Sequence, residues 1–258
     1  MPVVSAVMTT EILPGCEPFS ATGSRDGVLV LHGFTGNPQS MRPLANVLAN
    51  AGYSVELPRL PGHGTSVADM MTTTWADWSA AADAAFVDLS ARCDRVAVVG
   101  LSMGGGLTAY LAERHPEIVG AVFINPLVKP PADELRDGLN QLLDAGVETI
   151  ESIGSDIKKE GSVEASYDAT PLACVKSLFE GIDDVYANLS SITAPILVLS
   201  SRDDHVVTSD NGDALVEKVA GAVERIWLED SFHVATLDND APLVEAQTAA
   251  FVARVFGA

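Results

Sequence analysis

Apolar positions along the chain follow two patterns, short continuous runs and stripes at helical spacing. The runs predict buried strands at residues 28–31, 53–57, 95–99, 118–124, 195–200 and 224–228. The stripes predict helices at residues 40–51, 75–92, 103–114, 214–219 and 242–255. Strands that alternate with helices indicate an α/β fold with a mostly parallel sheet flanked by helices. Active sites in such folds lie at the carboxyl ends of the strands.

Residues 126–191 interrupt this alternation. Two prolines open the segment, and a stripe at helical spacing then includes Leu135, Leu139, Leu142, Ile150 and Ile153. We therefore predict a helical cap over 126–191, inserted into a core formed by residues 1–125 and 192–258. The stripe packs on the core in this interpretation, and as a lid it would also cover a lipophilic site.

Composition narrows the class of protein. The chain has 258 residues, 47% of them hydrophobic, and no apolar run approaches the ~20 residues of a membrane span. Residues 1–15 lack a basic stretch, so no secretory signal is predicted. Cys16, Cys93 and Cys174 are widely spaced and odd in number, which favours reduced thiols in a cytoplasmic protein over disulfides or a metal site.

The chain is strongly acidic, with a net charge of −20 from 35 acidic and 15 basic residues. Such a surface repels phosphate backbones and anionic headgroups, so we expect no nucleic-acid partner and no attraction to anionic membranes. It favours neutral over anionic substrates. General solubility explains the charge equally well.

A G-x-S-x-G motif, Gly100 to Gly104, lies between a predicted strand and a predicted helix. This is the context of a nucleophile elbow, a tight turn that exposes a serine hydroxyl in a strained conformation. Glycine at positions 100 and 104 avoids clashes between the strand and the helix. The motif therefore predicts Ser102 as a nucleophile, and a glycine-rich turn with an idle serine is the alternative.

A serine nucleophile needs a base and an acid that orients it. Asp203 and Asp204 follow the strand at 195–200, and His233 follows the strand at 224–228, at the same sheet edge as Ser102. Asp204 is preferred because it lies three residues before Val207, the spacing typical of this turn. The predicted triad is therefore Ser102, Asp204 and His233, in the chain order of this kind of fold.

The other histidines suit structural roles better. His205 follows the acid too closely to turn back toward it, and His115 ends a helix, where the dipole favours it. His63 lies in a tight loop. His32 opens the loop at 32–36, which supplies the second half of the site: an oxyanion hole needs backbone N–H donors, and Phe34 and Met103 are the candidates.

Several stretches together resemble one family. They are His-Gly-Phe-Thr-Gly at 32–36, Gly-His-Gly-Thr at 62–65, Gly-Leu-Ser-Met-Gly-Gly at 100–105, Ser-Ile-Gly-Ser-Asp at 152–156, Asp-His-Val-Val at 204–207 and His-Val-Ala-Thr-Leu-Asp at 233–238. The chain resembles serine α/β hydrolases, and more narrowly the bacterial monoacylglycerol lipases and thermostable carboxylesterases. The resemblance implies an α/β-hydrolase fold with a small helical cap inserted after the sixth core strand.

The resemblance also implies the functional residues. Ser102, Asp204 and His233 would form the triad, and Phe34 and Met103 would donate to the oxyanion. Ile153 would line the pocket from the cap. Glu164 and Asn125 would approach the glycerol end of a monoacylglycerol, with a solvated place on the cap surface as the alternative for Glu164.

The expected reaction is ester hydrolysis through an acyl-serine intermediate, on monoacylglycerols or similar medium- and long-chain acyl esters. It requires no metal and no cofactor. A general short- or medium-chain carboxylesterase or a thioesterase is the alternative. A carbon–carbon hydrolase or acyltransferase retains the same triad, and a non-catalytic binding relative often lacks a member of it. The cap surface could serve a homodimer or transient membrane contact, and a monomer is equally compatible.

Overall fold

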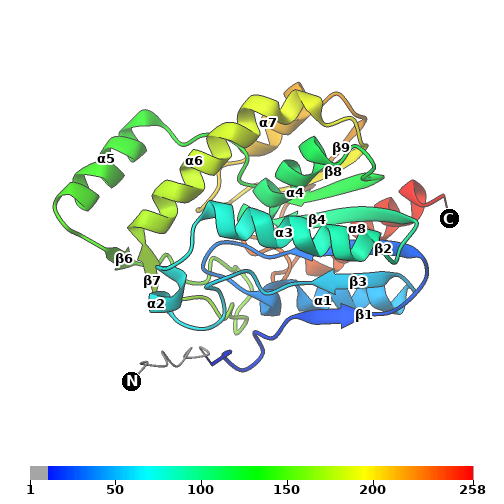
Figure 1. Ribbon diagram of the computed structural model, residues 1–258, viewed down its shortest axis with the longest axis horizontal. Helices are drawn as coiled ribbons and strands as arrows, with labels where there is room; N and C mark the ends of the chain where they lie inside the picture. Colours follow the sequence, from blue (N-terminus) through cyan, green and yellow to red (C-terminus); the bar gives the residue numbers. More distant parts are fainter. Residues whose placement is uncertain (1–10, 258) are drawn as a thin grey trace, which may run out of the picture.

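A computed structural model describes residues 11–257, so residues 1–10 and 258 of the predicted core lie outside the described residues. A seven-stranded sheet runs through the centre, in the order β1-β3-β2-β4-β5-β8-β9 (Figure 1). β1 pairs antiparallel with β3, and the other neighbours pair in parallel. The strands are β1 (Phe19–Ala21), β2 (Asp26–Leu31), β3 (Ser54–Leu57), β4 (Arg95–Leu101), β5 (Gly120–Ile124), β8 (Ile196–Ser201) and β9 (Val223–Leu228).

Helices cover both faces of this sheet. The helices α3 (Trp75–Ser90), α4 (Met103–Arg114) and α7 (Asp210–Lys218) lie on one face, and α1 (Pro38–Asn50) and α8 (Ala241–Val255) lie on the other. Alternate residues of β2 divide between the two cores: Leu29 and Leu31 pack under the first layer, and Val28 and Val30 pack under the second. The predicted α/β-hydrolase fold class is confirmed.

The segment between β5 and β8 contains the inserted elements. They are α5 (Asp133–Asp144), β6 (Thr149–Glu151), β7 (Ala169–Pro171), α6 (Leu172–Asn188) and a short 3-10 helix (Leu189–Ser191). Figure 1 shows α5 standing away from the sheet, with α6 between it and the core. The division of the chain into a core and a cap at 126–191 remains our proposal.

Two details of the predicted insertion are wrong. The predicted helical stripe ends early because Gly146 takes a φ of +79° after α5, and Ile150 and Ile153 then lie on β6 and in the loop that follows it. The insertion follows the fifth main-sheet strand in chain order and not the sixth, because β1 alone precedes β2 within the described residues.

The remaining predicted elements are present with small shifts at their ends. The last helix before β9 begins at Asp210, four residues earlier than predicted. The sequence pattern missed β1, the one-turn helix α2 (Val67–Met70) and the two short strands β6 and β7, and it gave no bounds for α6. Across residues 11–257, no helix is both long enough and apolar enough to cross a bilayer.

Candidate active site

Ser102 lies in the sharp turn between β4 and α4, with φ of 58° and ψ of −120°. A non-glycine residue in such a conformation costs about 1–3 kcal/mol and is held there by its surroundings. A Cβ atom on Gly100 would overlap the carbonyl oxygen of Gly104, and one on Gly104 would overlap that of Leu31. The glycines on either side of Ser102 are therefore required by the close approach of the strands and the helix.

Asp204 and His233 come from the loops after β8 and β9 and meet beside this turn. The Nδ1 atom of His233 lies 2.8 Å from Oδ2 of Asp204, and the side chains are 8% and 2% exposed. The other carboxylate oxygen accepts the main-chain N–H groups of Val206 and Val207, at 2.9 and 2.8 Å. Because the carboxylate accepts a hydrogen bond from Nδ1–H, Nε2 of His233 is left as the basic nitrogen. Asp203 has no place in this pair.

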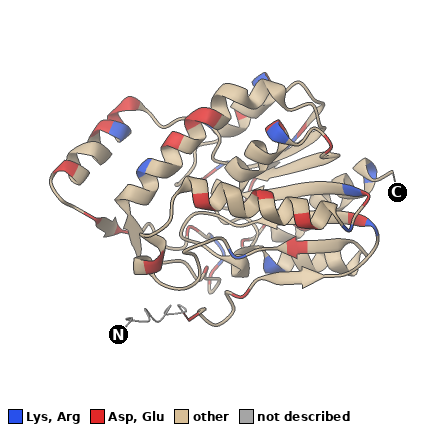
Figure 2. Ribbon diagram, viewed as in Figure 1, with Lys and Arg blue, Asp and Glu red and all other residues tan. Residues whose placement is uncertain are grey.

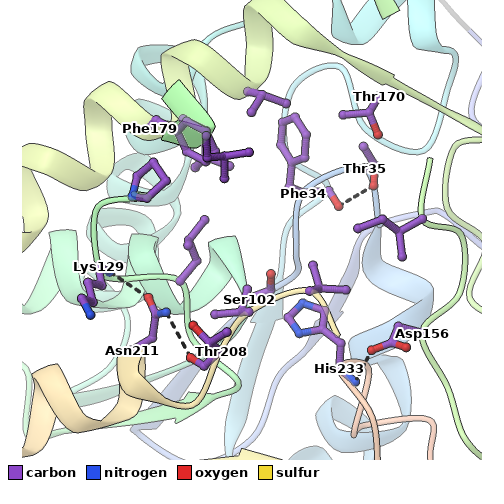
Figure 3. A pocket seen from close by; sticks show the side chains of 18 of the residues that line it. Phe34, Thr35, Ser102, Lys129, Asp156, Thr170, Phe179, Thr208, Asn211 and His233 are labelled. Atoms are coloured by element: carbon purple, nitrogen blue, oxygen red, sulfur yellow. Dashed lines mark hydrogen bonds between the residues drawn. The ribbon is translucent and has the colours of Figure 1, made fainter. Parts of the chain in front are cut away.

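Ser102 and His233 line the same cavity, as Figure 3 shows. The other histidines have different partners. His115 pairs with Asp83, and His205 pairs with Asp156. The structure thus brings the predicted nucleophile, base and acid together from three separate loops.

His32, the first residue of the loop at 32–36, and His63 are both buried. The two ring nitrogens of His32 are engaged by the carbonyl of Gly33, at 3.0 Å, and the N–H of Leu60, at 3.1 Å. Burial lowers the pKa of His32 to about 3 and that of His63 to about 4, so both rings are neutral. His63 packs edge-on against His32 and Phe34. These histidines support the loop and do not reach the cavity.

The predicted oxyanion donors lie on either side of Ser102. A Cβ atom on Gly33 would be 3.4 Å from the Cβ of Ser102, so this loop passes directly over the serine. Met103 is the first residue of α4, where an amide has no carbonyl one turn earlier in its own helix. Within residues 11–257, the loop hydrogen bonds include none donated by the amide of Phe34. These two amides therefore remain the candidate donors to a developing negative charge.

A cavity of about 640 Å³ extends from Ser102 beneath the inserted segment. Its volume is within the usual range for ligand sites. Most of its wall is apolar and comes from the insertion and from the loop after β8: Leu127, Pro130, Pro131, Leu135, Ile153, Val175, Leu178, Phe179 and Val206. Thr35, Thr170 and Asp156 lie at the other end from Lys129 and Phe179 (Figure 3). The cavity therefore has a long apolar wall, with polar side chains near Thr35 at one end and near Lys129, Thr208 and Asn211 at the other.

Glu164 and Ile153, two predicted substrate contacts, both line this cavity. Glu164 packs against the loop at 32–36, because a Cβ atom on Gly36 would be 2.7 Å from its Oε1 atom. Burial raises the pKa of Glu164, opposed by a hydrogen bond with Ser40 and by the nearby His233. Ile153 is 70% exposed, at the mouth of the cavity.

Asn125, the third predicted contact, does not line the cavity. Its side chain is buried, with Nδ2 donating to the carbonyl oxygens of His233 (2.8 Å) and Phe232 (3.2 Å) and to Oγ of Ser201 (2.9 Å). Its oxygen accepts the N–H of Ser201 at 2.7 Å. Asn125 follows a strand end, as predicted, but its short amide reaches sideways to the neighbouring loops. Asn125 therefore stabilises the main chain of the loop that carries His233.

Asp156 and Asp238, to which the sequence analysis assigned no role, both contact the loop that carries His233. Asp156, from the loop after β6, accepts the main-chain N–H of His233 at 3.0 Å. Asp238 is fully buried and accepts the N–H groups of Lys158, Lys159 and Phe232, each at 2.8 Å. These partners are distant in sequence, so no local pattern could have indicated them. No group of three or more His, Cys, Asp or Glu side chains in the described part of the chain could hold a metal ion.

The fold, the strained serine turn and the buried Asp–His pair define an α/β hydrolase. The family described as serine aminopeptidase, S33, matches residues 23–240, and the chain belongs to that family. It is 43% identical to the thermostable monoacylglycerol lipase of Bacillus sp. (strain H-257), over 95% of this chain and 98% of that protein. It is 27% identical to a carboxylesterase of Bacillus subtilis (strain 168), over 93% of this chain and 97% of that protein.

Solved structures agree with these relatives. A chain from work on LipS and LipT, two metagenome-derived lipolytic enzymes, has 43% identity and a TM-score of 0.90, with 95% of this chain and 100% of that chain covered. The comparisons confirm the resemblance to bacterial monoacylglycerol lipases and carboxylesterases. They also confirm the predicted class of enzyme, a carboxylic-ester hydrolase.

Proposed function

We propose that this protein hydrolyses monoacylglycerols through an acyl intermediate on Ser102. The observation that carries the proposal is the buried Asp204–His233 pair, 2.8 Å apart, whose histidine lines the same cavity as the strained serine and a long apolar wall. The apolar wall suits a fatty acyl chain, and the polar side chains near Thr35 and Glu164 suit a small alcohol.

Nε2 of His233 removes the proton from Ser102 as the serine oxygen attacks the ester carbonyl, and Asp204 stabilises the imidazolium that forms. The amides of Phe34 and Met103 stabilise the tetrahedral oxyanion. The intermediate collapses when His233 returns the proton to the leaving alcohol, and acyl-Ser102 remains. A water molecule activated by His233 then attacks the acyl carbonyl and regenerates the serine.

In this proposal two parts of the cavity divide recognition between them. The acyl chain would lie along the apolar wall toward Phe179, and glycerol would lie near the lining residues Thr35 and Glu164. Each buried methylene contributes ~0.8 kcal/mol, so eight contribute about 6 kcal/mol. A hydrogen bond to the Glu164 carboxyl contributes at most about 1.5–3 kcal/mol, the range for a charged partner. Chain length therefore dominates affinity, and glycerol recognition refines it.

Charge and thiols support a neutral substrate and a reducing compartment. Acidic residues predominate on α5 beside the cavity, as Figure 2 shows, which disfavours anionic substrates. Cys16, Cys93 and Cys174 are buried free thiols, in keeping with a cytoplasmic location.

The test compares 1-monoacylglycerols with methyl esters of the same C4 to C18 acids, with Ser102→Ala as the inactive control. We expect a higher kcat/KM for the glycerol esters and a preference for medium or long chains. Equal rates for both alcohols would replace the proposal with a general carboxylesterase. Hydrolysis that persists in Ser102→Ala would refute the mechanism.

Variants of Glu164 test recognition of the alcohol in the same assay. Glu164→Gln keeps the shape of the side chain and removes its charge, and we expect it to raise KM for the glycerol esters alone. Glu160→Gln alters an exposed glutamate in the same segment and serves as the matched control. A change of equal size for methyl esters would argue against contact with the alcohol.

A further inference from the structure

Asp156, in the inserted segment, contacts the loop after β9 that carries His233, here called the catalytic loop (residues 229–240). Oδ2 of Asp156 accepts the main-chain N–H of His233 at 3.0 Å, and its carbonyl oxygen accepts the N–H of Val234 at 3.1 Å. Figure 3 shows Asp156 beside His233 at the edge of the cavity. The Asp156 side chain is 10% exposed, so its charge lies in a partly dehydrated setting next to the base.

The second oxygen of the Asp156 carboxylate is paired with another histidine. Nδ1 of His205 donates to Oδ1 of Asp156 at 2.8 Å, and the His205 ring packs edge-on against Phe232. The hydrogen bond and charge of Asp156, with smaller contributions from Asp204 and Asp203, raise the pKa of His205. His205 is itself exposed, so its proton exchanges directly with solvent.

Asp238 fixes the same junction from the opposite side. This residue of the catalytic loop accepts the N–H groups of Lys158 and Lys159 in the insertion, while Asp156 in the insertion accepts an N–H of the catalytic loop. Oγ of Ser162 adds a bond to the carbonyl oxygen of Leu237, at 2.8 Å. The two segments hold each other by reciprocal bonds, so Asp156 occupies a defined place relative to His233.

We propose that Asp156 is a positioning residue for His233. Its carboxylate orients the main chain of the base and places beside it a negative charge, which the hydrogen bond from His205 to the same carboxylate offsets. The inference rests on the proposed function, in which His233 is the base. Asp156 touches no reacting atom in this proposal. It acts through His233.

The charged groups around His233 set the sign of the expected effects. Asp204 faces its ring, Asp156 faces its main chain, and Glu164 lies nearby across the cavity. Removing the charge of Asp156 destabilises the imidazolium, so the acidic limb of the kcat/KM profile moves to lower pH. Removing His205 leaves Asp156 uncompensated, so that limb moves to higher pH.

The experiment measures kcat and KM for one monoacylglycerol from pH 4.5 to 9 in Asp156→Asn, Asp156→Ala and His205→Asn. Asparagine retains an oxygen that accepts the His233 N–H, so Asp156→Asn removes the negative charge while the hydrogen bond to the main chain is kept. We expect the acidic limb to shift by about half a pH unit, downward in Asp156→Asn and upward in His205→Asn. The shift is smaller than an unscreened neighbouring charge would produce, because solvent screens the charges at this site. Asp156→Ala should also lower kcat about tenfold or more with little change in KM.

Asp168→Asn removes the same charge from an exposed position in the insertion and should leave the profile unchanged. Unshifted profiles in both Asp156→Asn and His205→Asn, or shifts of the same sign, would overturn the inference. Thermal unfolding shows whether each variant is folded, and a shift of the pH profile does not follow from instability alone. Full activity in Ser102→Ala and His233→Asn would instead refute the proposed function, so the two failures are distinguishable.

Discussion

Replacing Asn125 with alanine tests whether this residue supports the catalytic loop or contacts the alcohol. The wild-type amide satisfies the carbonyl oxygens of His233 and Phe232 and both the N–H and Oγ of Ser201, and it is buried. Alanine removes these partners together. The loop that carries His233 then loses its side-chain link to the end of β5, while the bond from Oγ of Ser201 on β8 to the carbonyl oxygen of Phe232 remains, at 2.8 Å.

The expected cost follows from the groups left behind. The N–H of Ser201 and the carbonyl of His233 lose a partner in a buried setting, at about 1–3 kcal/mol each. Asn125 also has a φ of 40°, and alanine adds about 1 kcal/mol there because it lacks the local hydrogen bonds with which asparagine tolerates this region. We therefore expect Asn125→Ala to lower the free energy of unfolding by about 3–7 kcal/mol.

Urea unfolding measures the stability, and kcat/KM on a glycerol ester and its methyl ester measures the function. A supporting role predicts a lower urea midpoint and an equal fractional loss of kcat/KM for both esters. Asn140→Ala, an exposed position on α5, is the matched control. An unchanged midpoint together with a rise in KM for the glycerol ester alone would show that Asn125 contacts substrate after all.

Three further predictions concern the turn, the cavity and the buried histidines. Gly104→Ala should unfold at a much lower temperature than wild type or fail to fold, since the new Cβ meets the main chain of Leu31; a wild-type Tm would contradict this packing. Phe179→Ala should move the preference toward longer acyl chains, with each added methylene worth about fourfold in kcat/KM, and an unchanged chain-length profile would refute the proposed acyl path. Because the folded-state pKa values of His32 and His63 lie near 3 and 4, below the unfolded value of about 6.5, only the unfolded chain gains protons as the pH falls below that value. Stability should thus fall by about 2 kcal/mol per ring between pH 7 and 5, and His63→Gln should reduce this loss in urea unfolding; a urea midpoint independent of pH would contradict it.

Much of the site was readable from local sequence. The nucleophile turn, for example, is encoded by a strand, two glycines around Ser102 and a helix, all within one short stretch. Asp204 and His233 follow strands of a parallel sheet, whose carboxyl ends share one edge, so their meeting with Ser102 was predictable from the order of elements. The end of α5 was not, because apolar spacing continues past Gly146 while the backbone there turns away.

What the sequence determined by itself was therefore the alternation of strands and helices and the placing of reactive groups at strand ends, because local spacing and glycine positions encode both. Tertiary structure alone decided that Asn125 turns inward and that Asp156 reaches the His233 main chain. Those outcomes depend on contacts between residues far apart in the chain. A buried hydrogen bond of that kind is selected by three-dimensional packing, which leaves no periodic signature in the sequence.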